Sequence, residues 1–387
     1  MEPTDPGPAD PPGLPGPHAA TPSGKPRARA LGIPFGGTPG RWNAVTDVPG
    51  VQVGYLTLIE GDSVRTGVTA IHPRGPAGAA DAVAAGFFSQ NGNGEMTGVS
   101  WIGESGTFSL PIAITTTHAV GIAHAAIVAW TAKHHPELGD DWPLPVAAET
   151  WDGYLNDPAR HRVTERVAIA ALESAASGPV EEGSVGGGTG MVCYEFKGGN
   201  GTASRLVDYA GTTYAVGVFL QANFGSRAEL TLAGMALGEL LADDNPRAGD
   251  AAVPPGAGSV IAIVATDAPL LPHQCTAMAR RVTLGLARTG TTGSHYSGDL
   301  FLAFSTANPG GFSPYDPGTG AGQRYDHLTF IPWGAMNPFF TAVVQAVEEA
   351  VANALVANEG MTGREGRRVP ALPRERVAEL FRARRRP

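Results

Sequence analysis

The chain has 387 residues, of which 42% are hydrophobic, and its formal net charge is -9 at pH 7. This length and apolar content allow a core for one large domain or two ordinary ones, and the acidic balance argues against a general nucleic-acid binder. The two cysteines, Cys193 and Cys275, are too few for a disulfide framework and favour a reducing, cytoplasmic setting.

The first segment, residues 1–26, holds nine prolines and has no apolar core of the kind that a signal peptide requires. We expect it to be a disordered leader, followed by a single catalytic domain over residues 27–363. The apolar stretches of the chain are interrupted short of the roughly 20 residues that span a bilayer, so no membrane association is expected.

The first half of the domain reads as strands followed by an Ala-rich helix over residues 119–134. His118 precedes this helix and is a candidate catalytic residue, although a histidine at such a corner more often fills a junction. The ten histidines show no paired spacing typical of a zinc site, so no metal is expected. The predicted strands occupy residues 51–57, 67–71 and 110–114.

Two polar segments of this half are candidates for lining a site. Residues 86–96 mix amides and a carboxylate with glycines, which suits either a pocket or a plain turn. Residues 147–157 hold Glu149, Trp151 and Tyr154, a mixture that suits a cationic ligand with an apolar side, or equally a capped turn.

The glycine-rich run at residues 183–191 lacks the Lys that ends a P-loop and leads into residues 191–196, which alternate like a strand. We therefore interpret this run as a tight loop lining a site and not as a phosphate cradle. A predicted strand over residues 214–225 carries Asn223, whose amide could donate to an oxyanion.

The second half alternates predicted helices and strands, which indicates stacked sheets covered by helices. The strand over residues 300–304 follows a polar group that contains Ser297 and Asp299. The predicted helices cover residues 230–242, 273–288 and 338–357, the last with Asn337 as N-cap and Pro338 at its first position.

The whole chain is organised around a Gly-Ser peptide bond. Residues 243–255 are polar and rich in Pro and Gly, as in an exposed loop, whereas residues 260–265 are continuously apolar, as in a buried strand. Ser259 is therefore expected to be the first residue of a central strand, with Gly258 at the end of a loop.

This arrangement suits self-cleavage. If the Ser259 hydroxyl attacks the Gly258 carbonyl carbon, the peptide becomes an ester, and its hydrolysis leaves Ser259 as a new N-terminus. A free α-amine has a pKa of about 7.7 to 8.0, so near neutral pH it can take the hydroxyl proton. The alternative is that Gly-Ser at a strand start is only a turn.

Together these segments resemble the DmpA-type aminopeptidases, the family of β-peptidyl aminopeptidases and L-aminopeptidase/D-esterases. The likeness runs from about Arg27 to at least Ala357. It is carried by residues 43–51, 64–69, 92–98, 186–191, 221–225, 265–270 and 297–299.

The resemblance implies an α+β fold, a four-layer αββα sandwich like that of N-terminal-nucleophile hydrolases but with different strand connectivity. It further implies self-cleavage between Gly258 and Ser259, no cofactor, a small peptide or amino-acid amide as substrate, and a homotetramer of processed heterodimers.

By family analogy, Ser259 is the nucleophile, its freed amine is the base, and Asn223 belongs to the oxyanion hole. Ser297 and Asp299 correspond to the pair that orients and charges the amine. Glu149 corresponds to the carboxylate that receives the free N-terminus of the substrate, which agrees with the preference of an ammonium for a partly desolvated carboxylate.

One position departs from the family pattern. Trp151 stands where members of the family carry a tyrosine whose hydroxyl is expected to help the oxyanion, and an indole can donate one hydrogen bond but cannot act as a hydroxyl acid. Tyr154, three residues on, is the alternative source of that hydroxyl.

Two other functions compete with a self-processing serine aminopeptidase. An ornithine acetyltransferase-like acyl transferase shares the sandwich, but that group is expected to use a Thr nucleophile. An unprocessed, non-catalytic binding protein of the same fold is the second. The C-terminal tail, residues 364–387, carries nine Arg against three Glu and is interpreted as a solvated surface helix with a frayed end.

Overall fold

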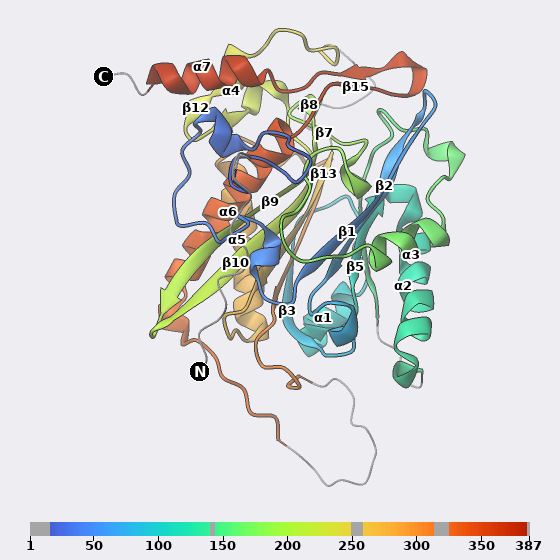
Figure 1. Ribbon diagram of the computed structural model, residues 1–387, viewed down its shortest axis with the longest axis vertical. Helices are drawn as coiled ribbons and strands as arrows, with labels where there is room; N and C mark the ends of the chain where they lie inside the picture. Colours follow the sequence, from blue (N-terminus) through green and yellow to red (C-terminus); the bar gives the residue numbers. More distant parts are fainter. Residues whose placement is uncertain (1–15, 140–143, 249–257, 313–324, 385–387) are drawn as a thin grey trace.

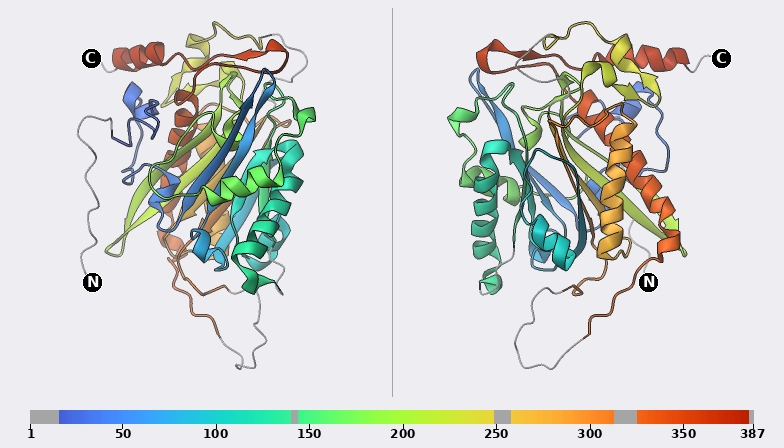
Figure 2. Two further views of the ribbon diagram at one scale, coloured as in Figure 1. Left: turned by 45° about the vertical axis from the view of Figure 1, so that its right-hand side comes forward. Right: turned by 180° about the vertical axis from the view of Figure 1, so that it is seen from behind.

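In the computed structural model, which describes residues 16–139, 144–248, 258–312 and 325–384, two sheets pack face to face (Figures 1 and 2). The smaller sheet has four strands, in the order β1 (Gln52–Glu60), β2 (Val64–His72), β5 (Ile112–Thr116) and β6 (Val146–Thr150). The larger has six, in the order β4 (Thr107–Phe108), β3 (Val83–Gly92), β14 (Gly298–Ser305), β13 (Ser259–Thr266), β10 (Thr212–Asn223) and β9 (Gly199–Tyr209).

Helices cover the outer face of each sheet. Helices α2 (Val120–His134) and α3 (Glu165–Glu173) lie on the four-stranded sheet, and α5 (Pro272–Ala287) and α6 (Asn337–Val356) lie on the six-stranded sheet (Figure 2). This arrangement confirms the αββα sandwich. The shorter helices are α1 (Val99–Ser105), α4 (Leu237–Leu240) and α7 (Arg374–Arg384), and the small hairpins are β7 (Val192–Cys193) with β8 (Phe196–Lys197), β11 (Thr231–Leu232) with β12 (Met235–Ala236), and β15 (Met361–Thr362) with β16 (Arg368–Val369).

The central strand β13 is apolar on both faces because each face meets a different core. Ile261 and Ile263 point into the core between the two sheets. Val260 and Val264 point into the core beneath α5 and α6. Side chains of a strand alternate between faces, so a strand with a core on both sides has an uninterrupted apolar sequence, as the run 260–265 predicted.

Two predicted elements are different in the structure. The helix predicted over residues 230–242 is the β11–β12 hairpin followed by the four-residue helix α4, because Ala233 and Gly234 both adopt positive φ and form a turn. The strand predicted over residues 191–196 is the β7–β8 hairpin, whose turn residues Tyr194 and Glu195 also have positive φ. Such turns favour glycine or asparagine, which explains why the sequence pattern missed them.

The N-terminal boundary of the ordered chain also differs from the prediction. Residues 16–26 are ordered: Ala20 forms a β-bridge with Pro26, and the ring of His18 hydrogen-bonds to the Gly40 carbonyl at 2.9 Å. The hydroxyls of Thr21 and Ser23 donate to the Glu181 carboxylate. The expectation of a disordered leader is therefore wrong for residues 16–26, and residues 1–15 lie outside the described part of the chain.

The C-terminal residues belong to the domain as well. Hairpin β15–β16 and helix α7 follow residue 360, and Val377 and Phe381 of α7 are buried in the core of the α5–α6 layer. The surface helix predicted here is present, but the predicted end of the domain at residue 363 is too early. Residues 385–387 lie outside the described range.

Helix α6 is the main core helix of the larger layer. Within the described residues it is the one helix whose length and hydropathy would suit a membrane span, contrary to the expectation that all apolar stretches are too short. Of its most apolar window, 83% is buried inside the fold, as in the core helix of a folded domain. It begins at Asn337 with Met336 at the cap position, one residue from the predicted cap.

Candidate active site

Three strand ends of the six-stranded sheet meet at Ser259. Ser259 is the first residue of β13, as predicted, and its side chain is buried. It pairs with Asn223, the last residue of β10, on one side and with Gly298, the first residue of β14, on the other. The sheet therefore places three candidate segments, far apart in the sequence, at one edge.

The smaller sheet contributes the residues after β6. The main-chain N–H of Trp151 donates to Ser259 Oγ at 3.3 Å, and Asn223 Nδ2 donates to the Trp151 carbonyl at 2.9 Å. The Val192 N–H donates to Asn223 Oδ1 at 2.8 Å. Because Oδ1 accepts this N–H, the amino group of the Asn223 amide faces Trp151 and the Ser259 side of the site.

The peptide bond before Ser259 is held on both sides. The Gly258 carbonyl oxygen accepts a hydrogen bond from the Gly298 N–H at 3.1 Å. A Cβ atom at residue 258 would lie 1.8 Å from the Asn223 carbonyl oxygen, so the backbone approach requires glycine there. Of the loop predicted over residues 243–255, the part from residue 249 onward lies outside the described residues.

Asp299 is a buried carboxylate surrounded by neutral donors. The Ser297 hydroxyl donates to Oδ1 at 2.6 Å, and Asn91 Nδ2 donates to Oδ2 at 2.8 Å. Burial raises the pKa of Asp299 above its ordinary value, against the opposing effect of these hydrogen bonds. Among the described residues no cation pairs with it, so the site holds a carboxylate without a counter-charge.

Glu149 is the second such carboxylate, with 3% of its surface exposed. The Thr117 hydroxyl donates to Oε2, and the Glu95 N–H donates to Oε1 at 3.1 Å. Burial raises its pKa as well. A Cβ at Gly94 would lie 3.2 Å from both Glu149 Oε1 and Gly298 Cα, so the loop at residue 94 bridges Glu149 and the residue that pairs with Ser259.

Three of these contacts come from residues that the sequence did not assign. Asn91 lies in the polar segment 86–96, which we considered a possible pocket lining, and the pairing of β3 with β14 brings it to Asp299. Thr117 ends a run of three threonines, which is only a weak signal. Val192 acts through its main-chain N–H, for which no side chain gives a signal.

The two aromatic candidates have different positions. Trp151 contacts Ser259 through its backbone, and 39% of its surface is exposed. The ring of Tyr154 instead packs beneath the guanidinium groups of Arg247 and Arg367, at 4.9 and 5.4 Å from the ring centroid. Of the two, Trp151 is the one in contact with Ser259.

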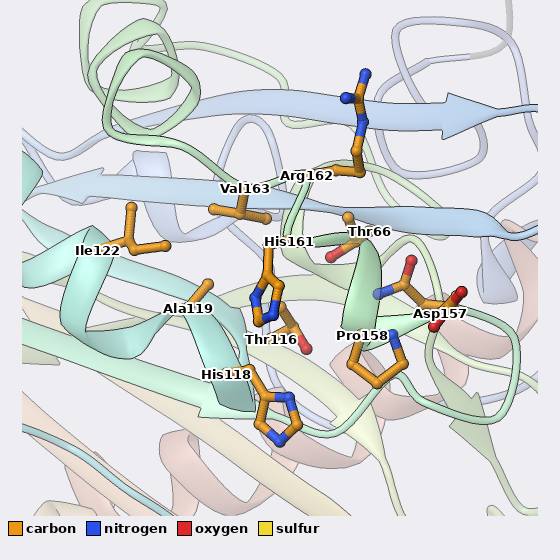
Figure 3. Close-up of a pocket in the computed structure, with 11 residues that line it drawn as sticks. Thr66, Thr116, His118, Ala119, Ile122, Asp157, Pro158, His161, Arg162 and Val163 are labelled. Atoms are coloured by element: carbon orange, nitrogen blue, oxygen red, sulfur yellow. The ribbon is translucent and has the colours of Figure 1, made fainter.

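His118 lies in a neighbouring pocket and has no hydrogen bond to Ser259. Figure 3 shows His118 and His161 projecting into this pocket, beside Asp157 and Pro158. Of the candidate catalytic residues, His118 lines this pocket, whereas Ser259, Asn223 and Asp299 do not. The described residues also contain no group of three or more His, Cys, Asp or Glu side chains that could hold a metal ion.

The glycine-rich loop lies inside the fold. A Cβ at Gly187 would lie 2.3 Å from Gln221 Oε1 and 2.6 Å from the Ile114 carbonyl oxygen, and a Cβ at Gly188 would lie 2.6 Å from the Asn200 nitrogen. For Gly187 and Gly188, the close backbone approach that we assigned to a ligand is made to the strands of both sheets.

Comparison with known proteins finds one peptidase family and several aminopeptidases. The sequence model of peptidase family S58 matches residues 43–369. The β-peptidyl aminopeptidase BapA of Sphingosinicella microcystinivorans is 44% identical over 378 residues, covering 93% of each protein. The solved L-aminopeptidase D-Ala-esterase/amidase of Ochrobactrum anthropi has a TM-score of 0.86 at 42% identity, over 93% of this chain and 99% of that one. The β-aminopeptidase of a Burkholderia species has a TM-score of 0.84 at 44% identity, over 93% of this chain and 100% of that one.

Proposed function

The chain belongs to peptidase family S58 and is a serine aminopeptidase, and we propose that it matures by cutting its own chain between Gly258 and Ser259. The observation that carries the proposal is the register of Ser259, which opens β13 directly beside Asn223 and Gly298. The similar proteins do not favour an acyl transferase or a non-catalytic binding protein.

Self-cleavage begins at the Gly258 carbonyl. Ser259 Oγ attacks the carbonyl carbon, the C–N bond breaks, and the nitrogen takes up the hydroxyl proton, which gives an ester and a free amine. Water then hydrolyses the ester to the Gly258 carboxylate and the restored Ser259 hydroxyl. The Gly298 N–H already donates to the Gly258 oxygen and would stabilise negative charge that develops there.

In the mature enzyme, the Ser259 amine would act as the general base for its own hydroxyl. Gly298 pairs with Ser259, so the Ser297–Asp299 pair flanks the position of this amine. Asp299 has no positive partner among the described residues, and an adjacent ammonium would supply one. Asn223 has a second amide N–H that would donate to the oxyanion of the substrate.

Substrate recognition would rest on Glu149, a buried carboxylate that can receive the ammonium group of a free N-terminus. We propose that the enzyme removes N-terminal residues from short peptides, amides or esters, and that β-amino acid residues are among them, as in the relatives named for that activity.

Intact mass under denaturing conditions tests this function. The expected result is two fragments, residues 1–258 and 259–387, whose masses sum to the full chain plus one water. Ser259→Ala should remain whole and inactive, whereas Ser305→Ala, a buried serine at the far end of β14, should be cut and active. Aminopeptidase activity in uncut Ser259→Ala would overturn the mechanism.

A further inference from the structure

Lys197, the last residue of β8, has a buried amino group without a carboxylate partner among the described residues. Its side chain is fully buried, and Nζ donates to the carbonyl oxygens of Met191 and Gly198, both at 2.8 Å. Burial lowers its pKa to about 7. Burying an amino group that carries charge without a carboxylate partner is unfavourable, so packing alone does not account for a lysine at this position.

The Met191–Val192 peptide unit connects Lys197 to the active site. Its carbonyl accepts from Lys197 Nζ and from the Gly198 N–H, the latter at 3.0 Å. Its N–H donates to Asn223 Oδ1 at 2.8 Å. In a trans peptide the C=O and N–H point in opposite directions, so fixing the carbonyl also fixes the N–H.

We propose that Lys197 is a positioning residue for catalysis: it holds the Met191–Val192 peptide in the orientation that turns the Asn223 amino group toward the oxyanion. This inference rests on the role of Asn223 in the proposed function.

The orientation of the Asn223 amide is set by this N–H together with the Trp151 carbonyl. If the amide were rotated by half a turn, its amino group would face the Val192 N–H and its oxygen would face the Trp151 carbonyl. Both contacts would then be repulsive. Hydrogen bonds in such a chain also polarise one another, so donation from Lys197 strengthens the donor at Asn223 Nδ2.

The β7–β8 hairpin does not need Lys197 for its shape alone. Arg227 donates to the carbonyls of Tyr194 and Glu195 in the turn, and Asn358 donates to the carbonyls of Lys197 and Gly198. Neither Arg227 nor Asn358 donates to the Met191–Val192 peptide in these contacts. Lys197 does, and this is the peptide whose N–H binds Asn223.

The test compares Lys197→Met and Lys197→Gln with the wild type, each assayed per processed chain. Removing an oxyanion donor outright costs about 100- to 1,000-fold in kcat. Because Asn223 remains but is less firmly oriented, the expected loss in kcat is about 10-fold, with KM within 2-fold. Thermal stability should be unchanged or higher, since an unpaired buried cation is removed.

Two readouts separate positioning from simple structure. The affinity for an aminoalkyl boronate, which forms a tetrahedral adduct with serine, should fall by the same factor as kcat/KM. In an Asn223→Ala background, Lys197→Met should change kcat by less than 2-fold. Arg227→Met, which removes a buried cation that binds the turn carbonyls of the same hairpin, is the control: it should lower stability while kcat stays within 3-fold.

Each other result has a definite meaning. A folded Lys197→Met enzyme with wild-type kcat and boronate affinity would overturn the inference, and so would an undiminished loss in the Asn223→Ala background. Failure of both Lys197 variants to fold would assign the lysine to the structure of the hairpin and would also overturn it. High kcat in Asn223→Ala itself would instead refute the oxyanion role in the proposed function. If Asn223→Ala is not processed, the double variant cannot be assayed. The boronate affinity of the two Lys197 variants then decides whether Lys197 is a positioning residue.

Discussion

Two buried glutamates in this chain have opposite surroundings. Glu349 of α6 binds Arg29 through two contacts, at 2.6 and 2.7 Å, and Arg205 at 2.7 Å, and Asn43 Nδ2 donates to it at 2.6 Å. Glu149 of β6, in the candidate active site, accepts hydrogen bonds from the Thr117 hydroxyl and the Glu95 N–H, and among the described residues it has no cationic partner. Within the described part of the chain, the charge of Glu349 is compensated by two arginines, whereas Glu149 has no cation beside it.

The pKa values move in opposite directions as a result. Burial alone would raise the pKa of Glu349, but hydrogen bonds and charge from Arg29 and Arg205 bring it below the ordinary value. The pKa of Glu149 is raised, because burial outweighs its two neutral donors. We infer that the first carboxylate stabilises the fold and that the second is available for a cationic ligand.

The largest effect is expected where the charges are paired. Glu349→Gln leaves Arg205 buried without its carboxylate, so the free energy of unfolding should fall by about 3 to 5 kcal/mol. Denaturant titration of the processed enzyme measures this loss. The kcat of the folded fraction should stay near the wild-type value, and a loss in the free energy of unfolding below about 1 kcal/mol would contradict a stabilising role for Glu349.

The matching change in the active site should affect binding and not stability. Glu149→Gln should raise KM for substrates with a free amine by roughly 30-fold, corresponding to about 2 kcal/mol for a hydrogen bond to a charged group. Steady-state kinetics measures KM, and denaturant titration should show equal or greater stability. An unchanged KM would remove Glu149 from amine recognition.

Asp299 is also a buried carboxylate, and its expected cationic partner is the freed α-amine of Ser259 instead of a substrate amine. Asp299→Asn should lower kcat by about 10-fold, within the usual range of acid–base effects, because the neighbouring ammonium loses its charge partner. The same loss should move the rising limb of the pH–rate profile to lower pH, since a nearby carboxylate favours the charged amine. A profile with an unmoved limb would count against contact between Asp299 and the Ser259 amine.

The smallest effect is a difference in pH dependence. The pKa of Glu349 is lowered by folding, so its contribution to stability is present above about 4.5 and is lost as pH falls through the folded value. The pKa of Glu149 is instead raised above 4.5, so its carboxylate takes up a proton at a higher pH than Glu349 does. Its protonation removes the negative charge that binds the substrate amine. The ratio of kcat/KM between wild type and Glu149→Gln should therefore fall while the stability difference for Glu349→Gln is still constant. Measuring both from pH 7 downward distinguishes the two carboxylates.

Much of this site could be predicted because its chemistry lies at strand ends. Ser259 and Asn223 were predicted at the ends of apolar strands, and pairing of β13 with β10 brings them together. The apolar runs also predicted α2, α5 and α6 closely. Continuous apolar sequence is the local sign of a strand or helix buried on several sides.

The remaining contacts depend on distances that no local pattern contains. Asn91 and Asp299 are 208 residues apart, and the sequence gives no reason to pair them before the sheet order is known. The support of Asn223 by Val192 is a main-chain contact, which is independent of side-chain type. The ordered N-terminal segment was missed because its prolines suggest disorder, while its anchors, such as the one between Thr21 and Glu181, are long-range.

The strand order has a consequence for the folding history of the protein. In the larger sheet, β13 and β14 come from the chain that begins at Ser259 and lie between β3 and β10, which come from residues before it. After the cut, the two fragments would share one sheet and could separate only by breaking the ladders on both sides of the inserted pair. Assembly of the intact chain is a unimolecular event, whereas reassembly of separated fragments would be bimolecular and depend on concentration. The mature enzyme would then stay folded mainly because it unfolds slowly, and less because its separated fragments can refold.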